Sequence, residues 1–381
     1  MKNFKFTAKF IAVGVLLFVM LSFNWDRIEL QGRAFVITIG IDASQDDGDD
    51  KFEVSMNIAD VAVMEGNGGD GEATVTRLAE GETLARAMGQ IDAKISDKIY
   101  YGHTKAVILG ESIISDEDLL KEVVDTLTRK NEINIKAIVM ATDGAAKDIL
   151  GAKTQEQSPL GLYLSGFYNS NNTNTAASVV KLDLEGLADS LRHDHSAVIP
   201  KITKEDEGEE VAISGVAVVK DFELAGYIPE DAMEGFLWLV ANGAGSQVAI
   251  EAQDGHITFL MAKSGTKFSF REEGGQLYCI AKFRTSGSIE GARFMKDDLY
   301  DTERMNQLQK DVAQKIHNKM EEIFRIFQED FPVDGFGLKE IMRKKYRHLH
   351  QRYGDDWDAT LENMIFVTDI DVTIRNAGSV K

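Results

Sequence analysis

The chain has 381 residues, which is long for one hydrophobic core, so we expect about two or three domains. Its apolar content of 44% and charged content of 27% are ordinary for a globular protein, while the formal net charge of −20 argues against binding to nucleic acid or to anionic lipid through charge. The single cysteine, Cys279, excludes an internal disulfide and any zinc or iron–sulfur site that needs several cysteines.

The N-terminus has the features of a membrane-targeting segment. Lys2, Lys5 and Lys9 form a basic flank before an uncharged apolar run at residues 10–23. This run is shorter than the ~17–25 apolar residues of a usual single span, although the stem of Lys9 lengthens it. Signal peptidase needs small residues before its cut, and the nearby positions match that need poorly. We therefore expect a retained anchor, with the bulk of the chain outside the cytoplasm by the positive-inside rule.

The region after the anchor alternates between strands and helices. Three near-continuous apolar runs are typical of buried strands: "FVITIGID", "KAVILGE" and "NIKAIVMA". The pattern also predicts a half-buried strand in "KFEVSMNIADVAV", a helix over residues 78–91, and a second helix through Lys130 with Ser115 as its N-cap. Alternation of helices with buried strands indicates a mixed α/β sheet.

The middle of the chain mixes polar loops with short apolar elements. The stretches "YNSNNTNTAAS" and "KEDEGEE" are polar or charged, as exposed loops are. The segment "AISGVAVVKDFELAGYIP" predicts two short strands around a turn at Asp221. The segment "DAMEGFLWLVANG" predicts an apolar helix that faces a core.

The last region predicts an antiparallel sheet with one face covered by a helix. Alternating strands begin near Lys267, and Cys279 lies in phase with the apolar residues of "LYCIAKF", so we expect a buried and inert thiol. A long helix over residues 302–328 carries an apolar stripe at three- and four-residue spacing. Its members are Met305, Leu308, Val312, Ile316, Met320, Ile323 and Phe327. The terminal "FVTDIDVTIR" alternates apolar and charged residues, as a half-buried strand does.

These patterns predict an α+β protein with three domains in a row, in which mixed or antiparallel sheets pack against helices after an N-terminal hydrophobic anchor. The signal or anchor segment takes residues 1–24, and an N-terminal α/β domain takes residues 25–152. A middle domain follows at residues 153–255. A C-terminal α+β domain with the long helix takes residues 256–381.

A glycine-rich stretch matches a nucleotide-binding pattern, but we interpret it as a loop. Gly66, Gly68 and Gly71 have the spacing G-x-G-x-x-G. The acidic residues around them would repel a pyrophosphate, and no clear helix opens directly after them. No cofactor is therefore expected.

An acidic stretch has spacing similar to that of a calcium loop. Asp42, Ser44, Asp46 and Glu53 fall at EF-hand-like positions. However, Asp47 stands where the sharp turn needs glycine, and the flanking segments are predicted strands rather than helices. We interpret the stretch as a solvated hairpin turn.

The histidines offer little support for a metal centre. His193 and His195 flank Asp194, and on a strand alternate residues would share a face, but no third ligand is near in sequence. His103 precedes a buried strand, and we interpret it as structural. No P-loop, H-E-x-x-H or nucleophile elbow is present, so no catalytic, cofactor-binding or metal-ligating residue is predicted.

Five motifs occur in the same order as in one protein family. They are "WDRIEL" with "AFVITIGID", "YYGHTKAVILGE" with "AAKDIL", "SGVAVVKDFELAGYI" with "GFLWL", "DGFGLKEIMRKKY", and "DVTIRNAG". From Trp25 to the C-terminus the sequence resembles the Ger(x)C family, the C subunits of the nutrient germinant receptors of bacterial spores. We expect Trp25 and Trp357 to be packing or interfacial residues.

The resemblance implies a non-catalytic, membrane-tethered subunit that acts in spore germination. Its implied partners are the membrane-embedded A and B receptor subunits, which are thought to sense the nutrient. The implied location is the extracytoplasmic side of the inner spore membrane. We therefore expect no enzyme activity, no nucleic acid partner and no direct nutrient binding by this chain.

One position departs from the family pattern. Members of the family are lipoproteins, and their lipidated cysteine directly precedes the Trp-Asp pair, where this chain has Asn24. Without a thiol no diacylglyceryl thioether can form, so lipidation at this position is excluded. The resemblance therefore implies the family's fold for this chain but not lipidation at this position.

Two other functions remain as alternatives to the receptor subunit. An extracytoplasmic solute-binding protein would have one large interdomain pocket with convergent polar groups. An envelope hydrolase would have a deep cleft with a pair of perturbed carboxylates. Three domains in an elongated row without such a cleft would favour the receptor subunit.

Overall fold

The computed structural model describes residues 33–376 apart from nine short gaps, at residues 46–47, 60–73, 153, 155–157, 169–180, 206–209, 241–244, 253–254 and 294–301. Within these described ranges, no helix is long and apolar enough to cross a membrane. The expected anchor, Asn24, Trp25 and the glycine-rich stretch at residues 66–71 lie outside them.

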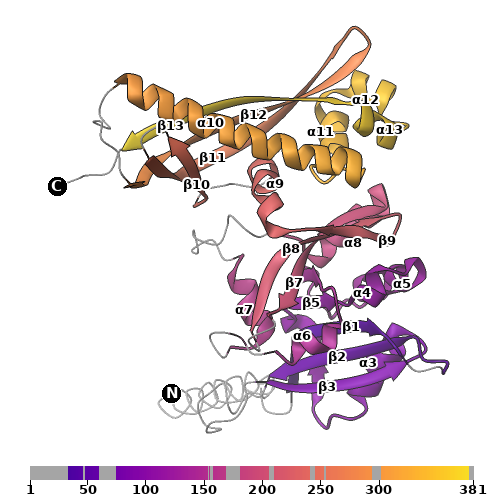
Figure 1. Cartoon of the computed structure of the whole chain (residues 1–381). Helices are drawn as coiled ribbons and strands as arrows, with labels where there is room; N and C mark the ends of the chain where they lie inside the picture. The colour runs from indigo at the N-terminus through magenta and orange to yellow at the C-terminus, as the bar shows by residue number, and fades with distance from the viewer. Residues whose placement is uncertain are drawn as a thin grey trace, which may run out of the picture.

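The larger unit is built on a nine-stranded mixed sheet (Figure 1). Its order is β3-β2-β1-β5-β6-β7-β8-β9, and β4 also pairs with β1. The strands are β1 (Arg33–Ala43), β2 (Phe52–Ala59), β3 (Thr74–Gly81), β4 (Lys98–Tyr100), β5 (Ala106–Leu109), β6 (Ile138–Ala141), β7 (Ser196–Lys204), β8 (Val211–Lys220) and β9 (Glu223–Ile228). Parallel β1, β5, β6 and β7 form the centre, and antiparallel strands lie on both sides.

Helices cover both faces of this sheet, which explains why the central strands β5 and β6 are apolar throughout. On one face, apolar residues of α3 (Leu84–Asp92), α5 (Glu117–Arg129) and α8 (Leu184–Asp194) pack on the sheet, and α4 (Glu111–Ile114) adds to the same core. The helices α6 (Ala146–Leu150) and α7 (Leu160–Gly166) cover the other face. The N-cap of α5 is Asp116, one residue after the predicted Ser115, because the Asp116 carboxylate accepts from the N–H of Leu119.

The smaller unit has a four-stranded sheet in the order β10-β11-β12-β13, with a long helix against it (Figure 1). Its strands are β10 (Gln247–Ala252), β11 (Gly255–Glu273), β12 (Gln276–Arg293) and β13 (Ile365–Asn376). Its helices are α9 (Met233–Val240), α10 (Thr302–Arg325), α11 (Leu338–Lys345), α12 (Arg347–Tyr353) and α13 (Trp357–Asn363). The predicted stripe of α10 is buried against the sheet from Leu308 onward, and Cys279 is fully buried in the same core.

The last strand runs in a direction that the sequence did not predict. β13 pairs with β12 in parallel, so the expectation of a purely antiparallel sheet is wrong for this strand. The chain leaves β12, passes through α10 to α13, and returns to the starting end of β12. A crossover of this length allows parallel pairing, which a short hairpin does not.

The two units share β8 at their junction. Alternate residues of β8 point to opposite faces: Ala217 and Val219 join the core of the larger unit, whereas Val216 and Val218 join the core of the smaller one. The α+β class with mixed sheets and packed helices is confirmed. The sheet continues across the predicted limit at residues 152/153, since β6 and β7 are hydrogen-bonded neighbours there. The exact domain limits stay a prediction.

Candidate functional site: a buried aspartate and an interdomain cleft

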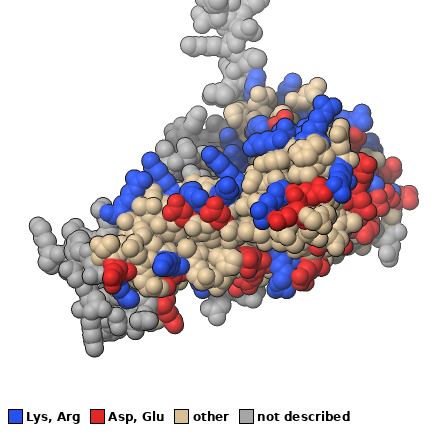
Figure 2. All heavy atoms as spheres, turned by 90° about the horizontal axis from the view of Figure 1, so that it is seen from above, with Lys and Arg blue, Asp and Glu red and all other residues tan. Residues whose placement is uncertain are grey.

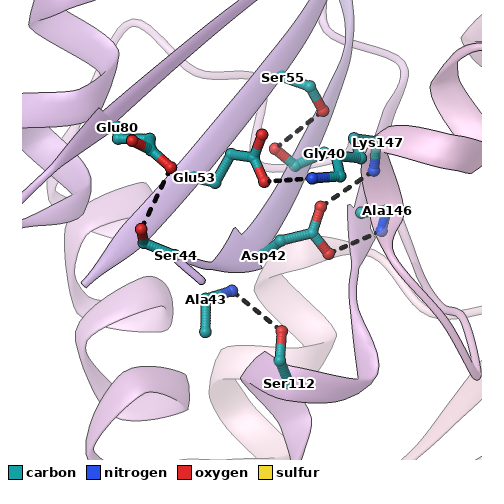
Figure 3. A network of polar contacts seen from close by, with 10 residues as sticks. All are labelled: Gly40, Asp42, Ala43, Ser44, Glu53, Ser55, Glu80, Ser112, Ala146 and Lys147. Carbon is teal, nitrogen blue, oxygen red and sulfur yellow. Dashed lines mark hydrogen bonds and ion pairs between the residues drawn. The ribbon is translucent and has the colours of Figure 1, made fainter. Parts of the chain in front are cut away.

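A buried carboxylate lies at the carboxyl end of β1, beside the ends of β5 and β6 (Figure 3). Asp42 is 4% exposed and accepts hydrogen bonds from the N–H groups of Ala146 at 2.7 Å and Lys147 at 3.0 Å. These are the first N–H groups of α6, which have no partner within the helix. Burial raises the pKa of Asp42, and the two N–H groups act against that rise.

The surroundings of Asp42 are closed. A Cβ added at Gly110 would lie 2.0 Å from Oδ1 of Asp42, so only glycine fits there. The Lys147 ammonium donates to the Glu53 carboxylate at 2.8 Å, and the Ser112 hydroxyl accepts from the N–H of Ala43 at 2.9 Å (Figure 3). Since its two oxygens accept hydrogen bonds from backbone N–H groups of α6, Asp42 has a structural role: it connects the end of β1 to the start of α6.

The predicted hairpin between β1 and β2 is confirmed. The two strands pair antiparallel, and the N–H of Ser44 donates to the carbonyl of Lys51. The expectation of a solvated turn is wrong for Asp42, because α6 folds over it and supplies its partners. Asp46 lies outside the described residues.

A cleft of about 740 Å³ lies between α8 of the larger unit and α11 and α12 of the smaller unit. Ligand sites commonly have volumes of ~300–1,000 Å³ and occur between domains. The lining is polar and comes from both units: Asp189, Ser190, His193, Asp194, Lys339, Glu340, Arg343, Lys344 and His350. Figure 1 shows α8 and the group α11–α13 on the same side of the molecule.

The α11 wall of the cleft is basic. Glu340 accepts from Arg343 at 2.7 Å and forms an ion pair with Lys344 at 2.9 Å. These two cations lower the pKa of Glu340 to about 2. Among the described residues, no carboxylate pairs with the ammonium of Lys339. Seen from above, acidic and basic side chains mix on the smaller unit, and basic ones gather toward one edge (Figure 2).

The α8 wall is acidic. Asp189 pairs with Arg192 at 3.2 Å, and its carbonyl oxygen lies 2.9 Å from Nδ1 of His193. Asp194 has no cationic partner among the described residues. Ser190 and Asp194 also line a second cavity of about 350 Å³ that lies next to the cleft.

Asp334 borders this second cavity and holds the start of α11. Its carboxylate accepts from the N–H groups of Phe336 at 3.3 Å, Leu338 at 2.9 Å and Lys339 at 2.8 Å. Burial raises the pKa of Asp334, and the negative charge of Asp194 adds to that rise. Asp334 therefore helps to orient the basic wall of the cleft, since its carboxylate binds the first two N–H groups of α11, those of Leu338 and Lys339.

His193, Asp194 and His195, which the sequence analysis considered as possible metal ligands and did not predict as a site, lie at the end of α8 and just after it. The expected strand geometry is wrong, because His193 and Asp194 form the last turn of α8. His195 follows as the left-handed C-cap, with φ of 52°, and its ring packs 5.6 Å from that of Phe222. Among the described residues, no group of three His, Cys, Asp or Glu side chains is placed to hold a metal ion.

The other singled-out residues are found in packing positions. His103 lies in a short 3₁₀ turn before β5, and its ring contacts those of Phe35 and Tyr100 at 5.2 Å and 5.4 Å. Trp357 is buried in the core of the smaller unit. The predicted burial of Cys279 is confirmed, and burial raises the pKa of its thiol well above the usual range, which disfavours the reactive thiolate.

Sequence reasoning singled out His193 and Asp194 but missed the opposite wall. Lys339, Arg343 and Lys344 occur in "DGFGLKEIMRKKY", which is basic within a chain of net charge −20. This local excess was the available signal. The sequence does not show that α8, about 150 positions earlier, lies across the cleft from this basic segment.

Two family models match consecutive parts of the chain. "Spore germination protein N-terminal domain" matches residues 26–204, and "Spore germination B3/ GerAC like, C-terminal" matches residues 214–378. Because the two models together account for most of the chain, it belongs to the GerAC-like family of spore germination proteins.

Individual relatives agree with this assignment. Spore germination protein KC of Bacillus subtilis (strain 168) is 24% identical over 369 residues, covering 88% of this chain and 86% of its own. Spore germination protein YndF of the same organism is 22% identical over 307 residues, covering 79% of this chain and 74% of its own. The crystal structure of the GerBC protein matches with a TM-score of 0.58 at 16% identity, covering 88% of this chain and 97% of that chain, which shows a shared fold.

Proposed function

We propose that this chain is the non-catalytic, membrane-tethered C subunit of a spore nutrient germinant receptor. The observation that carries the proposal is the match of both family domains, in order, along nearly the whole chain. The partners would be the membrane-embedded A and B subunits on the extracytoplasmic side of the inner spore membrane. Such a subunit raises the local concentration of contact surfaces beside the membrane complex and needs no reaction chemistry.

The tether would be the N-terminal apolar segment. Residues 10–23 are apolar and follow three lysines, and Asn24 offers no thiol for lipidation. Intact-mass measurement on protein extracted from spore membranes tests this step. A mass that includes residues 1–24 supports a retained anchor. A mature chain that begins near Trp25 would leave attachment to the partner subunits alone.

The function is tested by deleting the gene. Spores without it should respond weakly or not at all to one class of nutrient, whereas a germinant that bypasses receptors should still act. A plasmid copy of the gene should restore the response. Normal germination of the deletion strain across a broad nutrient panel would contradict the receptor assignment, once substitution by a related C subunit has been tested in a multiple deletion. Purification of the tagged chain from spore membranes, followed by mass spectrometry, tests the partners.

The structure offers different support for the two alternative functions, a solute-binding protein and an envelope hydrolase. A solute-binding protein is favoured by one observation, the polar cleft between the two units. A hydrolase would need a carboxylate free to move a proton, and one pair of interacting carboxylates beside the cleft is Asp194 with Asp334. The Asp334 oxygens are already engaged by three backbone N–H groups, so this pair is poorly suited to acid–base catalysis.

A further inference from the structure

The cleft and the smaller cavity form two adjoining compartments of different character. The cleft has about 740 Å³ and is lined by residues with polar or charged side chains, including the aliphatic stems of its lysines and arginine. The cavity of about 350 Å³ beside it is lined in large part by apolar side chains, together with Lys181, Asp194 and Asp334. The apolar members are Leu182, Ala197, Val198, Phe236, Leu237, Val240 and Val333. Since Ser190 and Asp194 border both spaces, a ligand held at the end of α8 can reach both.

The two walls of the cleft carry opposite charge. On the α11 wall, Lys339, Arg343 and Lys344 outnumber the single carboxylate Glu340. The cleft-lining charges of the α8 wall are carboxylates, and Asp194 has no cationic partner among the described residues. A molecule with one charge of each sign is therefore complementary to the cleft, whereas a simple anion or cation meets one wall of its own sign.

We propose that this cleft binds a short peptide with free ends and an apolar side chain. The peptide carboxylate would lie against Lys339 on the basic wall, its ammonium group against Asp194, and its apolar side chain in the smaller cavity. Because the charged groups stand on opposite walls, the two charges of the ligand must be separated, and each extended residue adds ~3.3–3.6 Å. A peptide provides this separation, whereas a single amino acid holds both charges on one carbon.

Such a ligand would join the two units of the molecule. The α8 wall belongs to the core of the large sheet, and the α11 wall belongs to the core of the smaller unit. A peptide that contacts both walls would stabilise their relative position, since it binds well only when both are in place. The proposal goes beyond the receptor assignment and does not depend on it.

The first test measures binding of the tripeptide Ala-Leu-Ala to the full-length, detergent-solubilised protein by isothermal titration calorimetry. The N-acetylated and the C-amidated tripeptides are the matched ligands, since each lacks one charge. We expect the free tripeptide to bind and each capped form to bind at least about tenfold more weakly, because a charge-assisted contact is lost. Alanine and leucine alone should bind more weakly still.

Two variants assign the charges. Asp194→Asn should bring the free and N-acetylated peptides to the same affinity while the penalty for C-amidation remains. Lys339→Gln should bring the free and C-amidated peptides to the same affinity while the penalty for N-acetylation remains. Asp118→Asn is the control for Asp194→Asn, since Asp118 is an exposed residue of α5 that does not line the cleft and its substitution changes the net charge in the same direction by the same amount. It should leave all the affinities unchanged.

The proposal is overturned if the free tripeptide does not bind at millimolar concentration, if the capped forms bind equally well, or if alanine alone binds as tightly. It is also overturned if Asp194→Asn and Asp118→Asn behave alike. These outcomes concern purified protein, so they are separate from the germination of deletion spores, and either result can fail without the other.

Discussion

Asp42 and Asp334 each accept hydrogen bonds from the first N–H groups of a helix, and the surroundings of the two carboxylates differ. Asp42 caps α6 inside the larger unit, and Asp334 caps α11 at the junction of the two units. Around Asp42 the packing is closed, to the point that Gly110 has no room for a Cβ. Asp334 instead borders a cavity. The same hydrogen-bonding arrangement thus connects β1 to α6 inside a closed core at Asp42, whereas at Asp334 it supports α11, which forms one wall of an open cleft.

The largest expected effect tests how closed the Asp42 region is. Gly110→Ala would place a Cβ 2.0 Å from Oδ1 of Asp42 and must displace the carboxylate from α6. Overpacking together with lost hydrogen bonds should lower the free energy of unfolding by about 3 kcal/mol. Gly89→Ala is the control, because Gly89 lies in α3 with nothing within 4 Å, and it should stabilise by about 0.5–1 kcal/mol. Denaturant titration of both variants checks this, and equal effects would mean that the site is not closed.

Asp334→Asn tests the contribution of the second carboxylate, which holds the start of α11 beside the cavity. An amide can no longer accept through both side-chain oxygens, so one N–H at the start of α11 loses its partner, at a cost of about 1–3 kcal/mol. The pKa of Asp334 is raised in the folded state, so the folded protein binds this proton more tightly than the unfolded chain. Wild-type stability therefore gains as the pH falls through the raised value toward the ordinary aspartate range, and Asp334→Asn lacks that gain.

The measurement is the free energy of unfolding of wild type and Asp334→Asn at several pH values below neutral. The difference between the two proteins should grow as the pH falls. A difference that shrinks would show that the pKa of Asp334 is lowered rather than raised. Asp42→Asn should show the same sign of pH dependence, since burial also raises the pKa of Asp42.

Cys279→Ala asks whether the core of the smaller unit is as closed as the Asp42 region. Cys279 is fully buried on β12, between Phe270 of β11 and Phe366 of β13. Loss of this small apolar group should cost about 1–2 kcal/mol and leave germination intact. A thiol reagent should label the native protein only after unfolding, and rapid labelling would contradict burial.

The smallest expected effect lies on the cleft wall itself. Glu340 is about half exposed, so its ion pairs with Arg343 and Lys344 are screened by solvent. Glu340→Gln should change the free energy of unfolding by less than about 0.5 kcal/mol at neutral pH. Because the pKa of Glu340 is lowered to about 2, this small contribution is present above the ordinary glutamate range and is lost as the pH falls toward 2. A loss above about 1 kcal/mol would mean that the wall is a buried, structural element, as Asp42 is.

The sequence by itself determined the family and several local elements, although residues 78–81, predicted as the start of a helix, form the end of β3. Apolar runs marked the central strands, the three- and four-residue spacing marked α10, and alternation placed Cys279 on the inner face of β12. These features depend on the period of side chains along one element, which is written in neighbouring residues. Ordered motifs along the chain were likewise sufficient to identify the GerAC-like family.

Only the tertiary structure decided which elements meet. The Asp42 carboxylate finds its partners 104 positions later, at Ala146, and nothing local marks that pairing. The parallel direction of β13 and the placement of α8 opposite α11 likewise depend on how long connections return across the packed cores. Side-chain periodicity records which face of an element is buried but not which element covers it, because that choice is made by the shapes of whole surfaces packing together.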